Sequence, residues 1–280
     1  MRAANLIESK INKRRRGIKV YWWRPEDRKK RNFGDEITPI FIEKLFGEKC
    51  LWTRLADCDM VGAGSVLEVV KNHNPRHHKL RVWGSGFIDK GPKLNNVDVT
   101  FDLVRGPLTN ERVSNRDIIP QGDPGLLASM VLERSESVKY KLGIVVHMKD
   151  LHDVNMQDWT DNVLIISPYQ TPAKVAKDIT SCEMVVSSSL HGLIFADSFE
   201  VPNFRLKHNT LEGGDYKFND YYQSTGRVMR SLTLADVEVL ADSPDSYTKT
   251  KKSYKPVKDL QKIQGTIITA FPFVKETARR

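Results

Sequence analysis

The sequence predicts an α/β protein built from two Rossmann-like domains that face one cleft. The chain of 280 residues is long enough for two domains, and 40% of its residues are hydrophobic, which supports two cores. Short β-rich runs alternate with helical patterns, an order that favours parallel sheets with right-handed crossovers. A polar break at 133–137 interrupts this alternation, which then begins again. We therefore expect domains at 1–135 and 136–280.

The first half contains apolar runs that predict four strands, at 18–23, 59–62, 79–84 and 97–104. A helix is predicted over 35–46, where apolar residues recur at helical spacing and Gly47 provides a C-terminal stop. Two more helices are predicted, over 107–113 and 125–132. Each has a proline at or just before its first residue, where proline is favoured.

The second half repeats the pattern, with predicted strands at 142–147, 163–167, 183–187 and 203–206. One helix is predicted over 172–182, opened by Thr171-Pro172, and another over 193–199. The alternation of strands and helices is the same as in the first half, which predicts a second parallel sheet.

The C-terminal part has a different composition. The stretch 242–254 is polar and basic and is predicted to be a linker. A last helix is predicted over 256–276, ended or kinked by Pro272. By analogy with other two-domain folds of this kind, we expect this helix to pack back on the first domain.

The formal net charge of +9 indicates an anionic partner. The basic residues do not interleave with aromatic residues as in nucleic-acid-binding modules, so no nucleic acid is expected. Basic clusters at 13–16, 28–31 and 249–252 have two interpretations. They form a solvated surface, or they attract the protein to an anionic membrane face that carries a lipid-linked glycan.

The sequence also bears on location. No run approaches the roughly 20 apolar residues of a membrane helix, and no apolar signal-peptide segment precedes Gly17. Three cysteines, Cys50, Cys58 and Cys182, match neither a disulfide framework nor a zinc spacing. We expect a cytoplasmic protein, with peripheral binding at the inner face of the membrane as one interpretation of its charge.

The segment 187–192 carries the clearest chemical signal. A predicted strand ends in three serines, and a helical pattern follows, in the order Ser187, Ser188, Ser189, Leu190, His191, Gly192. A helix N-terminus presents unpaired backbone N–H groups and a positive partial charge, so we expect an anion site here. A histidine in the first turn can move a proton near neutral pH. The alternative is a serine N-cap with a buried histidine.

Six further motifs lie at predicted strand ends or helix starts, at 32–36, 62–65, 84–86, 104–109, 122–127 and 217–222. In this order and spacing the motifs resemble the polysaccharide pyruvyltransferase family, over about residues 19–226. The resemblance implies a GT-B-like arrangement of the two domains. It also implies phosphoenolpyruvate as the donor and a polysaccharide sugar as the acceptor, with a cyclic ketal formed and phosphate released. No cofactor and no metal site are expected.

The implied reaction needs a proton shuttle and clamps for a carboxylate and a phosphate. His191 is the predicted shuttle, since the helix dipole lowers its pKa and a bound phosphate raises it. Arg105, at a predicted strand end, is the predicted clamp, because guanidinium binds such anions bidentately. The rest of the donor site is assigned to Ser187, Ser188, Ser189, Leu190 and Gly192. The family usually has an arginine or a serine two residues before this histidine, and here that residue is Ser189. The alternatives are a buried structural histidine and a surface arginine.

The acceptor is expected along the first domain and at two further segments. Asp35 is predicted to be a catalytic carboxylate that takes a hydroxyl proton, with an N-cap as its alternative. The predicted acceptor-binding residues are Asn32, Gly34, Glu36, His147, Asp150, Asp220, Tyr221 and Tyr222. The alternatives are a structural histidine at 147 and core packing for the two tyrosines.

Two other features are not expected to form sites. The glycine pairs in 62–64 and 84–86 each resemble half of a dinucleotide fingerprint, but neither completes it. His73, His77 and His78 lie together in a polar loop, with no carboxylate or cysteine placed to complete a metal site.

Two other functional classes remain open. The first is a GT-B-type glycosyltransferase that uses a sugar nucleotide, which is disfavoured because no lysine or arginine follows Val186 until Arg205. The second is a non-catalytic module that binds a sugar or a phosphate. A binding module of this class does not explain why polar groups occur at several strand ends.

Overall fold

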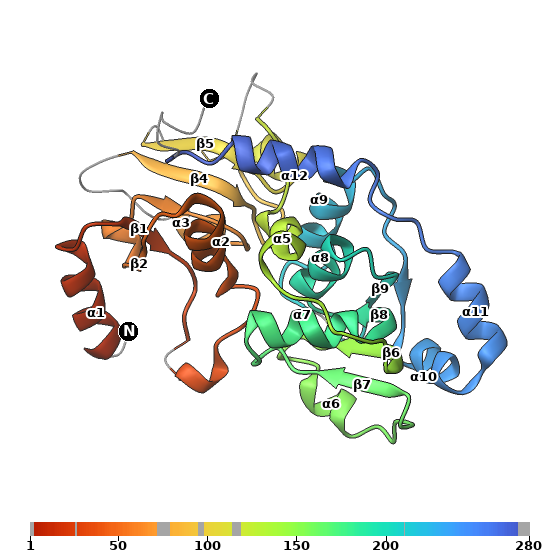
Figure 1. The fold of residues 1–280 in the computed structure, drawn as a ribbon. Helices are drawn as coiled ribbons and strands as arrows, with labels where there is room; N and C mark the ends of the chain where they lie inside the picture. Colours follow the sequence, from red (N-terminus) through yellow and green to blue (C-terminus); the bar gives the residue numbers. More distant parts are fainter. Residues whose placement is uncertain are drawn as a thin grey trace.

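The computed structural model describes residues 3–25, 27–71, 79–94, 98–113, 119–209 and 211–273. It contains two five-stranded parallel sheets, in the orders β2-β1-β3-β4-β5 and β10-β9-β8-β6-β7, with helices around them (Figure 1). When the strands of each sheet are numbered separately along the chain, both sheets have the order 2-1-3-4-5. This is a doubly wound order, so the predicted α/β class with two parallel sheets is confirmed.

The first sheet consists of β1 (Ile18–Tyr21), β2 (Cys50–Trp52), β3 (Met60–Val61), β4 (Leu80–Ser85) and β5 (Val99–Val104). The helices around it are α1 (Ala3–Lys13), α2 (Ile37–Phe46), α3 (Leu67–Val70) and α4 (Pro107–Val113). Helix α2 ends as the sequence predicts, because Gly47 adopts a left-handed conformation and its N–H bonds back to Ile42. Its N-cap is Glu36, so Asp35 lies outside the helix.

The second sheet consists of β6 (Tyr140–Val145), β7 (Val163–Ile166), β8 (Cys182–Ser187), β9 (Asn203–Leu206) and β10 (Ser231–Leu232). The remaining helices are α5 (Ala128–Val131), α6 (Leu151–Asn155), α7 (Pro172–Thr180), α8 (Leu190–Ser198), α9 (Tyr216–Ser224), α10 (Leu234–Asp242), α11 (Pro244–Lys252) and α12 (Leu260–Thr269). Among the described helices, none is long and apolar enough to cross a lipid bilayer.

The predicted linker at 242–254 is wrong, because this stretch forms α11. Its start is fixed by Ser243, whose hydroxyl accepts the Ser246 N–H, and by Pro244 at the first helical position. One side chain anchors the helix to the second sheet, since Tyr247 is buried and its hydroxyl donates to the Lys141 carbonyl at 2.8 Å. The polar composition of this stretch therefore gave no sign of the helix, which is stabilised by its N-terminal cap and by the buried Tyr247.

Helix α8 joins the two sheets. It is buried along its whole length, as expected for a helix that is apolar on nearly every side. One hydrophobic cluster includes Val20 and Ile37 from the first half and Val145 and Phe195 from the second. The Phe195 ring meets Phe33 edge-on, with 5.2 Å between ring centroids. Because this core crosses the predicted boundary, the division into 1–135 and 136–280 stays a prediction.

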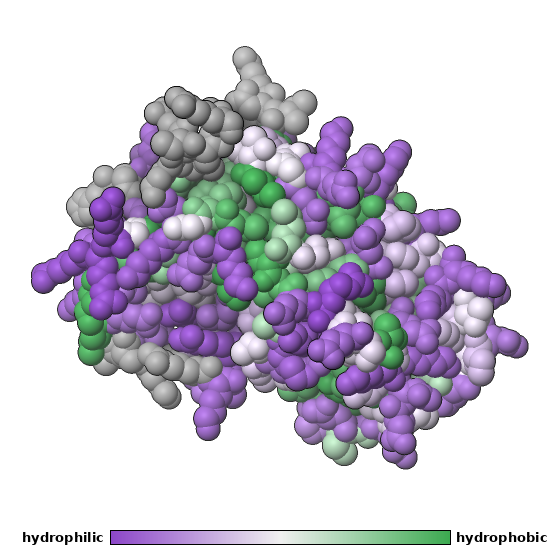
Figure 2. All heavy atoms as spheres, viewed as in Figure 1, coloured by the Kyte–Doolittle hydropathy of each residue, from purple (hydrophilic) through white to green (hydrophobic). Residues whose placement is uncertain are grey.

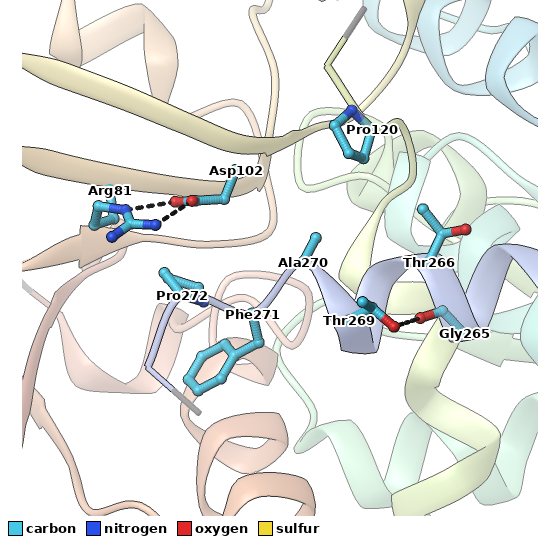
Figure 3. Close-up of a pocket in the computed structure, with 9 residues that line it drawn as sticks. All are labelled: Arg81, Asp102, Pro120, Gly265, Thr266, Thr269, Ala270, Phe271 and Pro272. Carbon is cyan, nitrogen blue, oxygen red and sulfur yellow. Dashed lines mark hydrogen bonds and ion pairs between the residues drawn. The ribbon is translucent and has the colours of Figure 1, made fainter. Parts of the chain in front are cut away.

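The C-terminal helix packs against the first sheet, as expected. Trp83 on β4 donates its indole N–H to the Ile267 carbonyl of α12 at 2.9 Å. Just after the helix, Phe271 stacks on Phe46 with ring centroids 3.8 Å apart. Figure 3 shows the open groove beside this contact, where Arg81 on β4 pairs with Asp102 on β5.

The shared core predicts a single unfolding transition for both sheets. Phe195→Ala removes an aromatic ring from the junction and should lower the free energy of unfolding by about 3–5 kcal/mol. Met130→Ala is the control, because Met130 is half-exposed and such substitutions usually change stability by about 0.5 kcal/mol or less. Denaturant unfolding followed by fluorescence and circular dichroism measures both. Two separate transitions, with Phe195→Ala shifting only one, would show that the sheets unfold independently.

Candidate active site

The topological switch points of the two sheets lie on either side of one cavity. In an order 2-1-3-4-5, the chain leaves the first and third strands in opposite directions, and the crevice at their carboxyl ends is the usual ligand site. Those strands are β1 and β3 in the first sheet and β6 and β8 in the second. A cavity of about 420 Å³ is lined by residues that follow three of them, including Asp35, Ser65 and His147. Lys217, from α9, also lines the cavity, and the other charged lining residues are Glu68, Lys149 and Glu212.

His191 lies just behind this wall, in the first turn of α8. Its ring fills the space beside Gly34, where any Cβ would overlap the imidazole. Gly64 lies on another side, and its notional Cβ would be 3.8 Å from His191 Cε1. The side chain is 8% exposed, and Nε2 is buried without a hydrogen-bond partner among the described residues. Burial, then the charges of Arg105 and Lys217, lower the pKa of His191 to about 3. The imidazole is therefore neutral at neutral pH and retains an unused nitrogen.

The pKa of Asp35 is shifted in the opposite sense to that of His191. Burial, and then the negative charge of Glu36, raise the pKa of Asp35 to about 7, while Lys217 opposes this shift. The carboxyl group lies on the cavity wall and exchanges its proton near neutral pH. Two groups whose pKa values are moved apart in one site are typical of an acid–base pair.

Lys217 is the site residue that the sequence did not identify. Burial, and then the charges of Arg105 and Arg205, lower its pKa to about 8, against the opposing charges of Asp35 and Glu212. Its ammonium group lies 5.5 Å from the Phe218 ring, and no described residue forms a hydrogen bond or an ion pair with it. The available signal was its place at the start of the motif 217–222, as the one basic residue there.

The serine turn is built as the sequence predicts, but two of its hydroxyls serve the turn itself. The Ser187 hydroxyl accepts the Ser189 N–H at 3.1 Å and lies 3.0 Å from the Val145 carbonyl. The Ser188 hydroxyl accepts the His147 N–H at 2.8 Å. Ser189 is the N-cap of α8 without a side-chain cap bond, and Leu190 begins the helix. Gly192 leaves room for Ser187, since its Cβ would overlap the Ser187 hydroxyl. None of residues 187–192 lines the cavity, and the donor contacts assigned to them stay a prediction.

Arg105 is neither a surface residue nor an open clamp. It is fully buried, and its Nε lies 2.9 Å from an Asp220 carboxylate oxygen. Its other two nitrogens donate to the Ser65 hydroxyl at 2.9 Å and the Phe87 carbonyl at 2.6 Å. Thr109 completes the shell of Asp220 through its N–H and hydroxyl, at 3.0 and 2.6 Å. Arg105 thus reaches the cavity wall through Ser65, and a direct donor contact stays a prediction.

The structure places Asp220, Tyr221 and Tyr222 in the interior, and none of them lines the cavity. Asp220 is the partner of Arg105. Tyr221 is fully buried and donates its hydroxyl to Asp197 at 2.6 Å. Tyr222 lies under the Arg227 guanidinium, 4.8 Å from its ring centroid. This arrangement corresponds to the core-packing alternative, because one face of α9 is turned to the protein interior.

The other predicted acceptor residues divide between the wall and the supporting loops. His147 lines the cavity, and burial, followed by the charge of Lys217, lowers its pKa to about 4. Asp150 is fully buried behind it and accepts the Asn209 N–H at 3.3 Å. Asn32 accepts the Gly34 N–H at 2.9 Å and so shapes the turn that leads to Asp35. Glu36 is not on the wall, because it pairs with Arg24 and Arg31.

Other grooves among the described residues do not bring these groups together. Two larger grooves, of about 670 and 650 Å³, lie beside α12 (Figure 3) and along α1, and neither is lined by Asp35, His147 or Lys217. Within the described ranges, no group of three or more histidine, cysteine or acidic residues is placed to hold a metal ion. His73, His77 and His78 lie outside the described residues.

The fold and the site define an α/β protein with one cavity between two doubly wound sheets, equipped for acid–base chemistry. A sequence model of the family "Polysaccharide pyruvyl transferase" matches residues 4–210, and the chain belongs to this family. Membership assigns it to transferases of polysaccharide biosynthesis.

Individual proteins show the same relationship. The chain is 37% identical over 209 residues to uncharacterized protein L143 of Acanthamoeba polyphaga mimivirus, covering 70% of this chain and 71% of L143. It is 25% identical over 217 residues to succinoglycan biosynthesis protein ExoV of Rhizobium meliloti (strain 1021), covering 76% of this chain and 66% of ExoV. A solved structure, the functionally uncharacterized protein KP1_0663 of Klebsiella pneumoniae, matches with a TM-score of 0.45 and 13% identity. That match covers 83% of this chain and all of KP1_0663.

The lowered pKa of His191 predicts that this residue makes the free energy of unfolding fall at acid pH. Between the ordinary pKa of 6.5 and about 3, the unfolded chain binds a proton at His191 that the folded protein does not. The neutral ring therefore contributes stability above pH 6.5 that is lost as the pH falls toward 3. The difference in unfolding free energy between wild type and His191→Gln should change by up to ~1.4 kcal/mol per pH unit in this window. Parallel pH curves for the two proteins would contradict this expectation.

The packing of Gly34 against the imidazole predicts a size limit at position 34. Gly34→Ala should lower the free energy of unfolding by about 1–3 kcal/mol, because its methyl group overlaps the buried His191 ring. The matched control is Gly265→Ala on α12, where no atom lies within 4 Å of the new Cβ. That control should be neutral or stabilising, as alanine favours a helix. Denaturant unfolding measures both variants. Equal effects would mean that the His191 ring does not fill this space.

Proposed function

We propose that this protein transfers pyruvate from phosphoenolpyruvate to a sugar of a bacterial-type surface polysaccharide or its precursor. The product is a cyclic ketal, and phosphate is released. Family membership supports pyruvyl transfer. The observation that carries the proposal is the convergence of Asp35, His147 and Lys217 on one cavity, with neutral His191 directly behind its wall.

The reaction sets the chemical requirements of the site. C3 of the enol takes a proton and becomes a methyl group, which leaves C2 electron-poor. Two hydroxyl oxygens of one sugar bond to C2, and the C2–O bond to phosphate breaks. Of the two hydroxyl protons released, one replaces the proton given to C3 and the other leaves with phosphate. The enzyme therefore needs one group that supplies a proton and another that accepts one.

His191 and Asp35 fit these two roles. Neutral His191 has an unpaired ring nitrogen, and a bound dianion would raise its pKa by neutralising the nearby cations. His191 then carries the proton to C3. Asp35, with a pKa of about 7, takes the hydroxyl proton when ionised. The two groups lie close together, since a Cβ placed at Gly64 would be 3.5 Å from an Asp35 carboxylate oxygen and 3.8 Å from His191 Cε1.

The proposed arrangement of substrates follows the two sheets. The donor lies at the start of α8, where N–H groups of the first helical turn and the Ser189 hydroxyl have no described hydrogen-bond partner. The acceptor lies on the side of Asp35 and His147. This corresponds to a GT-B-like pair of lobes and requires no cofactor.

For the acceptor, we propose a lipid-linked glycan at the cytoplasmic face of a membrane. A groove along α1 is lined by Ile7 and Ile11, which are about half-exposed, together with Arg15, Arg24 and Arg31. Figure 2 shows hydrophobic atoms over α1, bordered by hydrophilic side chains. Apolar and cationic groups side by side suit an anionic membrane surface. Arg24 directly follows Trp23, which lines the cavity, so this surface adjoins the proposed active site.

Phosphate release from phosphoenolpyruvate tests the proposed activity. Wild type should release phosphate only with a suitable acceptor glycoside, and His191→Gln should cut turnover by ~10²–10⁴-fold. Glutamine keeps a polar side chain of similar size but cannot titrate, so stability at pH 7 should change little. Comparing free glycosides with lipid-linked acceptors in vesicles identifies the carrier.

Sugar nucleotides provide the control for this assay. Thermal stabilisation by a nucleotide sugar, with none by phosphoenolpyruvate, would overturn the proposal in favour of glycosyl transfer. A fully active His191→Gln variant would remove His191 from the proton transfer.

A further inference from the structure

The cavity wall holds a cation whose charge nothing in the protein neutralises by direct contact. Lys217 lies in the first turn of α9 and lines the cavity beside Asp35 and His147. No described residue makes a hydrogen bond or an ion pair with its ammonium group, and its surroundings depress its pKa. An ammonium group that faces a cavity without a partner from the protein is satisfied by solvent or by a bound anion.

The neighbouring cations are already engaged. Arg105 is bound by Asp220, Ser65 and the Phe87 carbonyl. Arg205 pairs with Asp215 and lies 3.8 Å from the Phe218 ring centroid. Of the two lysines that line the cavity, Lys149 is exposed, whereas Lys217 is partly buried.

The nearest acid does not remove this need. Asp35 and Glu212 both favour the Lys217 charge through space, yet neither forms an ion pair with it among the described residues. The Asp35 carboxyl group is also partly protonated near neutral pH. An incoming anion with strong acceptor oxygens is the missing partner.

We infer that Lys217 is the anion-binding residue of the cavity and contacts the phosphate or the carboxylate of the bound donor. This inference rests on the proposed function for the identity of the donor. In this arrangement Lys217 makes the direct contact with the donor that the sequence predicts for Arg105. Arg105 instead stabilises the cavity wall through its hydrogen bond to Ser65. Pairing of Lys217 with an anion would also relieve one of the positive charges that disfavour a proton on His191.

Calorimetric titration of three proteins with three anions tests the inference. The proteins are wild type, Lys217→Met and Lys217→Arg, and the anions are inorganic phosphate, pyruvate and phosphoenolpyruvate. Lys217→Met should weaken binding of phosphoenolpyruvate by about 10- to 100-fold, the range for a lost charge-assisted bond. Lys217→Arg should recover part of the affinity, because it keeps the charge but not the shape of the ammonium group.

Lys207→Gln is the matched control. It removes the same charge from a lysine that is exposed and pairs with Asp215 outside the cavity, so its affinities should equal those of wild type. Melting temperatures establish that all variants are folded. A loss of affinity for phosphoenolpyruvate that is shared by only one of the two smaller anions, inorganic phosphate or pyruvate, supports the inference and identifies the contacted group.

Two results would overturn the inference. One is equal affinity of Lys217→Met and wild type for phosphoenolpyruvate. The other is a loss of affinity in Lys207→Gln as large as that in Lys217→Met, which would reduce the effect to net charge. Failure of the proposed function gives a different result. In that case no acceptor supports phosphate release, while the affinity for anions still falls when Lys217 is replaced.

Discussion

The site depends on the buried ion pair between Arg105 and Asp220. Both side chains are fully buried, and together they join the end of β5 to α9. Asp220 is one helical turn after Lys217, so fixing Asp220 also fixes the rotation of α9 that turns Lys217 toward the cavity. Arg105 also holds Ser65 on the opposite wall. Removing one member of such a pair costs about 3–5 kcal/mol, because the other charge remains buried.

A fixed set of buried charges explains why the pKa values of His191 and Asp35 are shifted in opposite directions. Arg105 and Lys217 both disfavour a proton on His191, whereas Lys217 favours the ionised form of Asp35 against the stronger effect of burial. The resting site thus holds a neutral histidine and a carboxyl group that titrates near neutrality. These charges are set by folding, because the groups that carry them are held by the packed structure.

The sequence predicted the fold class well, because strands and helices leave local periodic signals. It also located the turn 187–192 and His191, where three serines precede a helix. It missed features that only tertiary contacts create. Nothing local shows that Arg105 meets Asp220, 115 residues away, or that Lys217 lines the cavity while Tyr221 and Tyr222 pack in the core. The short strand β2 and the polar helix α11 were missed for the same reason, since pairing and one buried tyrosine stabilise them.

The repeated topology explains why the cavity lies between the sheets. Each sheet has its own switch point, and a single doubly wound sheet would present its strand ends to solvent. Here β8 leads directly into α8, which is buried by residues of both sheets. His191, on the first turn of that helix, is thereby pressed against the backbone that follows β1 and β3. The core around α8 is continuous between the two halves, and this packing holds His191 close to Asp35. The same helix therefore stabilises the junction and positions the histidine.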